Sequence, residues 1–268
     1  MWIFLLFVLL VIALLWLTYF QPQINYNKFL VNRCSKASYY PYPVWNENNP
    51  APFFFVISAN VYFSNCSNLG PLPPPTGFTA TSITSNVGGR NDMYGYVFEN
   101  QESVIIAFTG TFYYHQWALD LKTQLTSAEN LNNSNPEIKA HQGFLAIYNG
   151  MKDQLRKINF HGKKLYLTGI SLGGALASLA ALDLAQYHPI VYTFGSPRVF
   201  NIKGAELVNQ LVPDITRIYN SEDVVPTLPL AIGEKQNYMH VGKNRVFTLN
   251  LGSTLRNHTE AYLKYFLK

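Results

Sequence analysis

Residues 164–177 of this chain read KLYLTGISLGGALA, and they are the strongest indication of the fold. It begins as a short apolar strand, passes through Gly169-Ile170-Ser171-Leu172-Gly173, and continues with small residues that suit a helix packed on a sheet. This order is typical of a nucleophile elbow, which exposes a serine on a sharp turn between strand and helix. The turn brings backbone so close on both sides that positions 169 and 173 require glycine. The stretch therefore predicts an α/β fold with Ser171 as a candidate nucleophile, and an ordinary glycine-rich turn is the alternative.

The composition indicates one folded domain. Of 268 residues, 48% are hydrophobic, 15% are aromatic and 13% are charged. A chain of this size, less an apolar N-terminal segment, suits a single α/β domain. The aromatic content fits either work at an apolar surface or a thick aromatic core. The formal charge of +5 comes without a Lys/Arg run or a nucleic-acid motif, so we expect no nucleic-acid partner and weak attraction to anionic membranes.

Residues 1–20 contain no charged side chain and are rich in Leu, Ile, Val, Phe and Trp. Twenty helical residues span about 30 Å, the thickness of the hydrocarbon core of a bilayer. The segment lacks both a basic start and a small-residue cleavage site, which a signal peptide normally has. We therefore expect a single-pass membrane anchor over residues 1–20, with a cleaved signal peptide and secretion as the alternative.

The side of the membrane stays open at this stage. Three basic residues after the apolar segment favour a cytoplasmic domain: Lys28, Arg33 and Lys36. Glycosylation sequons that begin at Asn65 and Asn132 favour the lumenal side. Cys34 and Cys66 are compatible with one disulfide in an oxidising compartment or with two buried thiols.

The remaining sequence divides into a connector over residues 21–52, with a short helix over residues 26–34, and a domain over residues 53–268. Within the domain we expect strands over residues 79–84, 94–98, 104–108, 190–194, 215–219 and 244–249, and a short elbow strand that starts at residue 164 and leads into the turn around Ser171. We expect helices over residues 53–63 and 143–158, after Ser171, and from residue 259 onward. Strands that alternate with helices predict a mostly parallel, mixed central sheet flanked by helices.

A serine nucleophile needs a histidine base and an acid, and in this type of fold both follow the serine, the acid first. Asp223 follows the predicted strand at 215–219 and so lies at the sheet edge that carries the elbow, whereas Asp214 precedes that strand. Chain order admits both His240 and His258 as the base. The polar turn around His258 favours it over His240, whose flanks resemble a buried strand.

Two backbone N–H groups are candidates for an oxyanion hole. The first belongs to Leu172, which follows the nucleophile at the start of a helix. The second belongs to Thr111, which follows the predicted strand at 104–108 and the tight turn that Gly110 permits.

These segments together resemble the fungal-type lipases (class 3), an α/β-hydrolase family. The matching stretches, in the family's order, are IAFTGT (106–111), WALDL (117–121), HQGF (141–144), LTGISLGGA (167–175), YTFGSPR (192–198), DVVPTLP (223–229), YMHVG (238–242) and NH (257–258). The resemblance implies an α/β-hydrolase fold in which Ser171 is the nucleophile, Asp223 the acid and His258 the base. It also makes Thr111 and Leu172 the oxyanion-hole residues, while His240 matches a position that is not catalytic.

The resemblance further implies a lid over the active site at residues 112–117. Its aromatic residues are Phe112, Tyr113, Tyr114 and Trp117. The chain departs from the family at Thr109, where an arginine is usual, so we expect different local packing there. The apolar N-terminal segment is also absent from the secreted fungal enzymes.

The function that the resemblance implies is hydrolysis of the carboxylic esters of lipids, such as triacylglycerol or diacylglycerol, at a membrane or droplet interface. A phospholipase A1 and a small-ester esterase are alternatives within the same chemistry. An acyltransferase that uses the same acyl-enzyme and a catalytically idle membrane scaffold are further alternatives. We expect no metal or cofactor, because no Cys/His/carboxylate cluster has ligand spacing.

Overall fold

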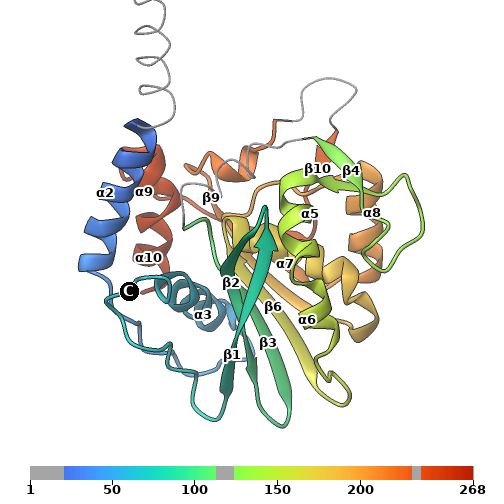
Figure 1. Cartoon of the computed structure of the whole chain (residues 1–268), viewed down its shortest axis with the longest axis horizontal. Coiled ribbons are helices and arrows are strands. Elements are labelled where there is room, and N and C mark those ends of the chain that lie inside the picture. The colour runs from blue at the N-terminus through green and yellow to red at the C-terminus, as the bar shows by residue number, and fades with distance from the viewer. Residues whose placement is uncertain (1–20, 113–123, 231–236, 268) are drawn as a thin grey trace, which may run out of the picture.

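A mixed sheet of seven strands organises the computed structural model, which describes residues 21–112, 124–230 and 237–267 (Figure 1). The strands lie in the order β1-β2-β3-β6-β7-β9-β11. Their bounds are β1 Thr79–Val87, β2 Arg90–Glu99, β3 Ser103–Phe108, β6 Lys164–Ile170, β7 Ile190–Phe194, β9 Ile215–Asn220 and β11 Lys243–Phe247. The first three strands pair antiparallel, and every pairing from β3 to β11 is parallel. The predicted mostly parallel, mixed sheet is confirmed.

The hairpin of β1 and β2 extends beyond the predicted strands. Val87 pairs with Arg90 across Gly88 and Gly89, which have φ values of 62° and 80°. A two-residue turn with positive φ at both positions matches the twist of an antiparallel pair. The backbone pairing of β1 with β2 therefore continues through polar residues that have a low strand propensity.

A small second sheet, which the sequence did not predict, lies in the order β10-β8-β5-β4. Its strands are β4 Leu125–Ser127, β5 Lys139–His141, β8 Phe200–Asn201 and β10 Tyr238–Met239. Strands of two or three residues are too short to show an alternating pattern.

Helices cover both faces of the seven-stranded sheet. The longer ones are α2 Gln21–Ser35, α3 Ala51–Phe63, α5 Gln142–Asn149, α7 Leu172–Asp183, α8 Ile202–Leu211 and α10 Glu260–Phe266. The shorter ones are α6 Lys152–Arg156, α9 Thr254–His258 and the 3-10 turns η2 Ala185–Tyr187 and η3 Val225–Thr227. In Figure 1, α3 lies on one side of the sheet and α5, α6, α7 and α8 on the other.

The helix predicted over residues 143–158 is wrong as a single element, because α5 and α6 are separate. Gly150 lies between them, and a Cβ at this position would approach Ser85 Oγ to 2.1 Å and Asn86 O to 3.0 Å. The backbone at Gly150 therefore lies too close to β1 for a residue with a side chain at this position.

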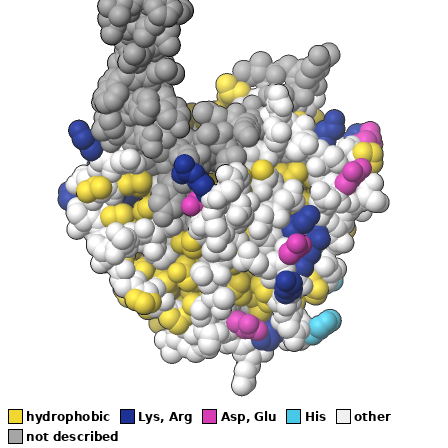
Figure 2. All heavy atoms as spheres, in the orientation of Figure 1, with side chains coloured by type: hydrophobic (Ala, Val, Ile, Leu, Met, Phe, Trp, Pro, Cys, Tyr) yellow, Lys and Arg dark blue, Asp and Glu magenta, His cyan; other side chains and the backbone are white. Residues whose placement is uncertain are grey.

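The two faces of the sheet bury separate cores, and β3 contributes to both. Val104, Ile106 and Phe108 pack with α5 and α7, whereas Ile105 and Ala107 pack with α3. This alternation is the period of two expected for a strand with both faces covered. In Figure 2, the charged side chains of the visible face lie in mixed groups of both signs, with hydrophobic side chains between them.

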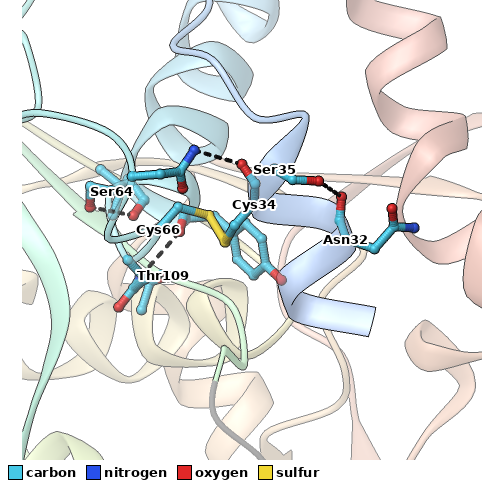
Figure 3. Close-up of a disulfide and its surroundings, with 10 residues drawn as sticks. Asn32, Cys34, Ser35, Ser64, Cys66 and Thr109 are labelled. Carbon is cyan, nitrogen blue, oxygen red and sulfur yellow. Dashed lines mark hydrogen bonds between the residues drawn. A yellow bond between two sulfur atoms is a disulfide. The ribbon is translucent and has the colours of Figure 1, made fainter. Parts of the chain in front are cut away.

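A disulfide joins Cys34, at the end of α2, to Cys66, just after α3 (Figure 3). The two cysteines are 32 residues apart in the sequence. Of the two alternatives left open above, one disulfide or two buried thiols, the structure has the disulfide. Helix α2 is longer than the predicted helix over residues 26–34.

The predicted membrane anchor over residues 1–20 lies outside the described residues. Among the helices of the described part of the chain, none combines the length and the apolar character needed to cross a bilayer.

Candidate active site

Ser171 occupies a strained turn between β6 and α7. Its φ of 57° and ψ of −123° lie in a region that residues with a Cβ rarely adopt. A Cβ at position 169 would lie 2.2 Å from the backbone of Gly173, and one at position 173 would lie 2.2 Å from Phe108 O. Both flanking glycines are therefore required by backbone contact, as the elbow pattern predicts.

The structure brings Ser171, His258 and Asp223 together from three separate segments. His258 Nε2 lies 2.8 Å from Ser171 Oγ, and His258 Nδ1 lies 2.7 Å from Asp223 Oδ2. Asp223 follows β9, and His258 is the last residue of α9. The Asp223 side chain is fully buried, while that of His258 retains 14% exposure.

The order of the hydrogen bonds follows from the donor capacity of each group. A carboxylate only accepts, so His258 Nδ1 carries the proton that it donates to Asp223. The neutral imidazole then has Nε2 free to accept the hydroxyl proton of Ser171. This arrangement suits Nε2 as a general base and Ser171 Oγ as a nucleophile.

Tyr262 is a further residue of the site, which sequence reasoning missed. Its hydroxyl donates to Asp223 Oδ2 at 2.7 Å and accepts from Asn220 N at 3.1 Å. Burial and the neighbouring Asp223 carboxylate raise the pKa of Tyr262 well above its usual value, so the phenol remains a donor. The signal in the sequence is its place in the predicted C-terminal helix, four residues after His258.

Two buried asparagines join the Asp223 loop to the segment that carries His258. Asn220 Nδ2 donates to Leu249 O at 2.9 Å and to Asn257 O at 3.2 Å. Asn257 Nδ2 donates to Glu222 O at 3.1 Å, which closes the connection from the other side. The separation between acid and base is thus fixed by side-chain amides, and these contacts also escaped sequence analysis.

The candidate oxyanion region lies beside the serine. Leu172 is the first residue of α7, where the N–H groups of the first turn have no partner within the helix. A Cβ at Gly110 would lie 3.6 Å from Ser171 Cβ and 3.2 Å from Ile170 O. Thr111, the next residue, is therefore at the same edge of the sheet as Ser171.

Thr109, at the position where the family resemblance leads one to expect arginine, is held by hydrogen bonds with β2 and with the segment after α3. Thr109 is fully buried, and its N–H donates to Tyr94 O at 2.9 Å. Asn65 Nδ2 donates to Thr109 Oγ1 at 3.3 Å and to Tyr62 O at 3.1 Å. The turn after β3 is thereby attached to the end of α3, beside the disulfide.

Of the four predicted lid residues, only Phe112 belongs to the described part of the chain. Phe112 is buried, with its ring 5.4 Å from that of Tyr62, and it packs in a cluster with Leu30, Phe63 and Cys66. Tyr113, Tyr114 and Trp117 lie outside the described residues.

His240 does not take part in the triad. Its Nε2 lies 2.6 Å from Pro226 O, a backbone carbonyl in η3. Burial, with the nearby Arg217 guanidinium, lowers the pKa of His240 to about 3. A neutral His240 therefore donates to Pro226 O and supports the loop that follows Asp223.

The described ranges contain no group of three or more His, Cys, Asp or Glu side chains that would hold a metal ion.

Comparison with known proteins gives a consistent set of matches. Residues 105–232 match the family described as lipase (class 3). The galactolipase DONGLE, chloroplastic, of Arabidopsis thaliana is 27% identical over 217 residues, which cover 66% of this chain and 44% of that protein. Phospholipase A1-Igamma2, chloroplastic, of the same organism is 30% identical over 164 residues, which cover 48% of this chain and 31% of that protein.

Among solved structures, the triacylglyceride lipase of Rhizomucor miehei superposes with a TM-score of 0.61 at 25% identity. The match covers 75% of this chain and 80% of that one. The chain spans less than half the length of the two chloroplastic relatives.

Proposed function

Because this chain belongs to the class 3 lipase family of α/β-hydrolases, we propose that it cleaves the carboxylic esters of lipids through a covalent acyl-enzyme. The observation that carries the proposal is the pair of hydrogen bonds made by His258, 2.8 Å to Ser171 Oγ and 2.7 Å to Asp223 Oδ2. Ser171 attacks the acyl carbon while His258 Nε2 takes its proton, and His258 then returns that proton to the leaving alcohol. In the second half of the reaction, His258 Nε2 takes a proton from water, which attacks the acyl carbon. His258 then returns the proton to Ser171 Oγ as the fatty acid leaves.

The oxyanion of each tetrahedral intermediate is bound by the N–H groups of Leu172 and Thr111. A donor of this kind typically contributes about 3 kcal/mol of transition-state stabilisation. The proximity of Gly110 to Ser171 and the position of Leu172 at the start of α7 support this assignment.

The primary substrates are glycerides, with triacylglycerol and diacylglycerol first. The wide coverage of the match to a triacylglyceride lipase supports this choice. Exposed apolar side chains on the segments that carry Asp223 and His258 also support it, since they offer a surface to lipid: Val224, Leu228, Leu230 and Leu255. The lid over the active site is proposed at residues 112–117, of which Phe112 is buried against Tyr62.

A polar glycerolipid is the second candidate substrate, which would make the enzyme a phospholipase A1 or a galactolipase. The names of the two chloroplastic relatives favour it. A short-chain esterase, an acyltransferase and an idle scaffold remain as outcomes that the experiment below separates.

The enzyme is held at a membrane by residues 1–20, with its catalytic domain on the lumenal or extracellular side. The Cys34–Cys66 disulfide supports this side, because such bridges persist in oxidising compartments. Arg33, which favours the opposite side by its charge, lies over the Tyr62 ring at 4.8 Å and so also has a packing role.

The test is hydrolysis by the full chain in mixed micelles, with Ser171→Ala as the control. The substrates are triolein, diolein, phosphatidylcholine, a galactosyl diacylglycerol and a short-chain p-nitrophenyl ester. We expect fatty-acid release that the Ser171→Ala variant lacks, with glycerides cleaved fastest. Preference for a polar lipid or the short ester would change the substrate class and leave the triad in place.

Equal rates for the wild type and the Ser171→Ala variant would remove the elbow serine from the mechanism. Adding glycerol or a sterol as acceptor separates transfer from hydrolysis, since a transferase forms a new ester in place of free acid. If the wild type shows no serine-dependent activity on any of these esters or acceptors, the result favours the catalytically idle scaffold.

A further inference from the structure

Three Asn-x-Ser/Thr sequons lie in the described part of the chain. They begin at Asn65, Asn132 and Asn257. In the lumenal domain proposed above, each sequon is accessible to the enzyme that attaches N-linked oligosaccharides during synthesis. The folded structure distinguishes among them, because a glycan replaces a hydrogen on the side-chain nitrogen and must extend into solvent.

The amide of Asn65 is already engaged at the active-site edge. Its Nδ2 donates to Tyr62 O and Thr109 Oγ1, and the next residue, Cys66, is half of the disulfide beside Thr109 (Figure 3). Thr109 is fully buried under this contact. A sugar on Asn65 Nδ2 would separate the turn before Thr111 from α3, so this sequon is incompatible with a glycan in the folded enzyme.

Asn257 is excluded by burial. It is only 6% exposed, its Nδ2 donates to Glu222 O at 3.1 Å, and its Oδ1 accepts from Leu251 N at 2.7 Å. It directly precedes His258. A glycan here would displace the segment that carries the histidine of the triad.

Asn132 has the opposite environment. It is exposed at a turn where its φ is 51°, a conformation that asparagine tolerates. Its Nδ2 donates to the exposed Gln186 Oε1 at 2.8 Å, a contact that water can replace. Beside it lies an open surface hollow of about 740 Å³ whose lining includes Glu129, Lys152 and Gln186.

This turn lies at the far end of the molecule from Ser171. Gln186 follows the C-terminus of α7, whereas Ser171 precedes its N-terminus, and the 12 residues of α7 separate them by about 18 Å. A bulky group on Asn132 therefore leaves the mouth of the active site clear for lipid.

We propose that Asn132 carries an N-linked oligosaccharide and that Asn65 and Asn257 remain unmodified in the folded enzyme. Asn132 Nδ2 attacks the anomeric carbon of an oligosaccharide carried on a lipid diphosphate. A nitrogen–carbon bond forms, the carbon–oxygen bond to the diphosphate breaks, and the amide proton leaves with the lipid diphosphate. No oxidation or reduction takes place. The proposal rests on the lumenal placement of the domain.

The test is expression of the full chain in eukaryotic cells, followed by treatment with peptide N-glycosidase and comparison of mobility on a denaturing gel. We expect the wild type to lose one glycan. The Asn132→Gln and Ser134→Ala variants should show no change on treatment, because both destroy the sequon. The Ser134→Thr variant should keep the shift, since it preserves the sequon while altering the same residue.

Asn65→Gln is the matched control at the second sequon, and it should keep the wild-type shift. A shift that survives Asn132→Gln, or one that Asn65→Gln removes, would overturn the assignment. A wild type with no shift would also overturn it, and thiol alkylation of that sample then locates the fault. A protected Cys34–Cys66 pair means that lumenal placement stands and only Asn132 fails, whereas two reactive thiols mean that the placement fails as well.

Discussion

The hydroxyl of Tyr262 donates a 2.7 Å hydrogen bond to Asp223 Oδ2, the same oxygen that lies 2.7 Å from His258 Nδ1. One carboxylate oxygen thus receives both the imidazole and a phenol, and Val225 N donates to the other oxygen at 3.0 Å. The orientation of Asp223 toward His258 is set by this surrounding set of donors.

Tyr262→Phe should therefore lower kcat about tenfold, which corresponds to ~1.4 kcal/mol, while leaving KM unchanged. The cause is a less restrained Asp223 and a buried Asn220 N–H that loses its acceptor. Steady-state kinetics on an emulsified glyceride measure both constants. Tyr265→Phe is the control. Tyr265 lies on the same helix as Tyr262, and its ring stacks on that of Phe247 in β11, with the ring centroids 4.1 Å apart. Equal kcat values for the two variants would contradict a positioning role for Tyr262.

Asn65→Ala should reduce kcat about tenfold, with KM unaltered, because it releases the turn that leads to Thr111. The loss of one hydrogen bond to a buried hydroxyl has an expected cost of about 1–2 kcal/mol. Asn68→Ala is the control, because Asn68 Nδ2 donates to Cys34 O at 2.9 Å in the same region without touching the turn. If both variants lose activity equally, the effect belongs to the region around the disulfide and not to Thr109.

The stability of the protein should fall with acid because of His240. Its folded pKa of about 3 lies below the ordinary value of 6.5, so between these pH values the unfolded chain binds a proton that the folded chain does not. The free energy of unfolding therefore rises with pH across this window and is independent of this group above it. Between pH 7.5 and pH 5 the loss amounts to about 2 kcal/mol.

His240→Gln should remove this part of the acid sensitivity, since glutamine does not titrate and its amide is a donor suited to Pro226 O. Urea unfolding of both proteins at pH 7.5 and pH 5 measures the difference. An identical fall in stability for wild type and variant would show that His240 is not the group responsible.

Removing the disulfide should lower the free energy of unfolding by about 3–4 kcal/mol, as expected for a closed loop of this length. The Cys34→Ser/Cys66→Ser variant is compared with the wild type by urea unfolding, with and without dithiothreitol. Reductant should shift the wild-type midpoint toward that of the variant and leave the variant unchanged. A reductant effect on the variant would point to another cause.

The sequence predicts the elements that build the serine, because their signals are local. The strand, the glycines around Ser171 and the small residues of α7 lie in one continuous stretch, and β7 has the predicted bounds. Helix α3 starts two residues earlier than predicted, because a proline at position 52 is accommodated in the first turn of a helix.

The missed features depend on contacts between distant residues. Asn65 reaches Thr109 across 44 residues, and Asn220 reaches Asn257 across 37. No periodicity marks such pairs, because each asparagine alone resembles an ordinary turn residue. The amphipathic α8 was also not predicted, although Asn201 caps it by accepting from Gly204 N.

Ser171 and its base are 87 residues apart, and the helix that follows His258 packs against a helix from the start of the domain. Phe266 of α10 stacks on Phe55 of α3 at 4.6 Å and also meets Phe194 of β7. A growing chain that ends at α8 contains Ser171 but does not yet contain His258. The hydrogen bond between Ser171 and His258 therefore forms only when the two ends of the domain have met.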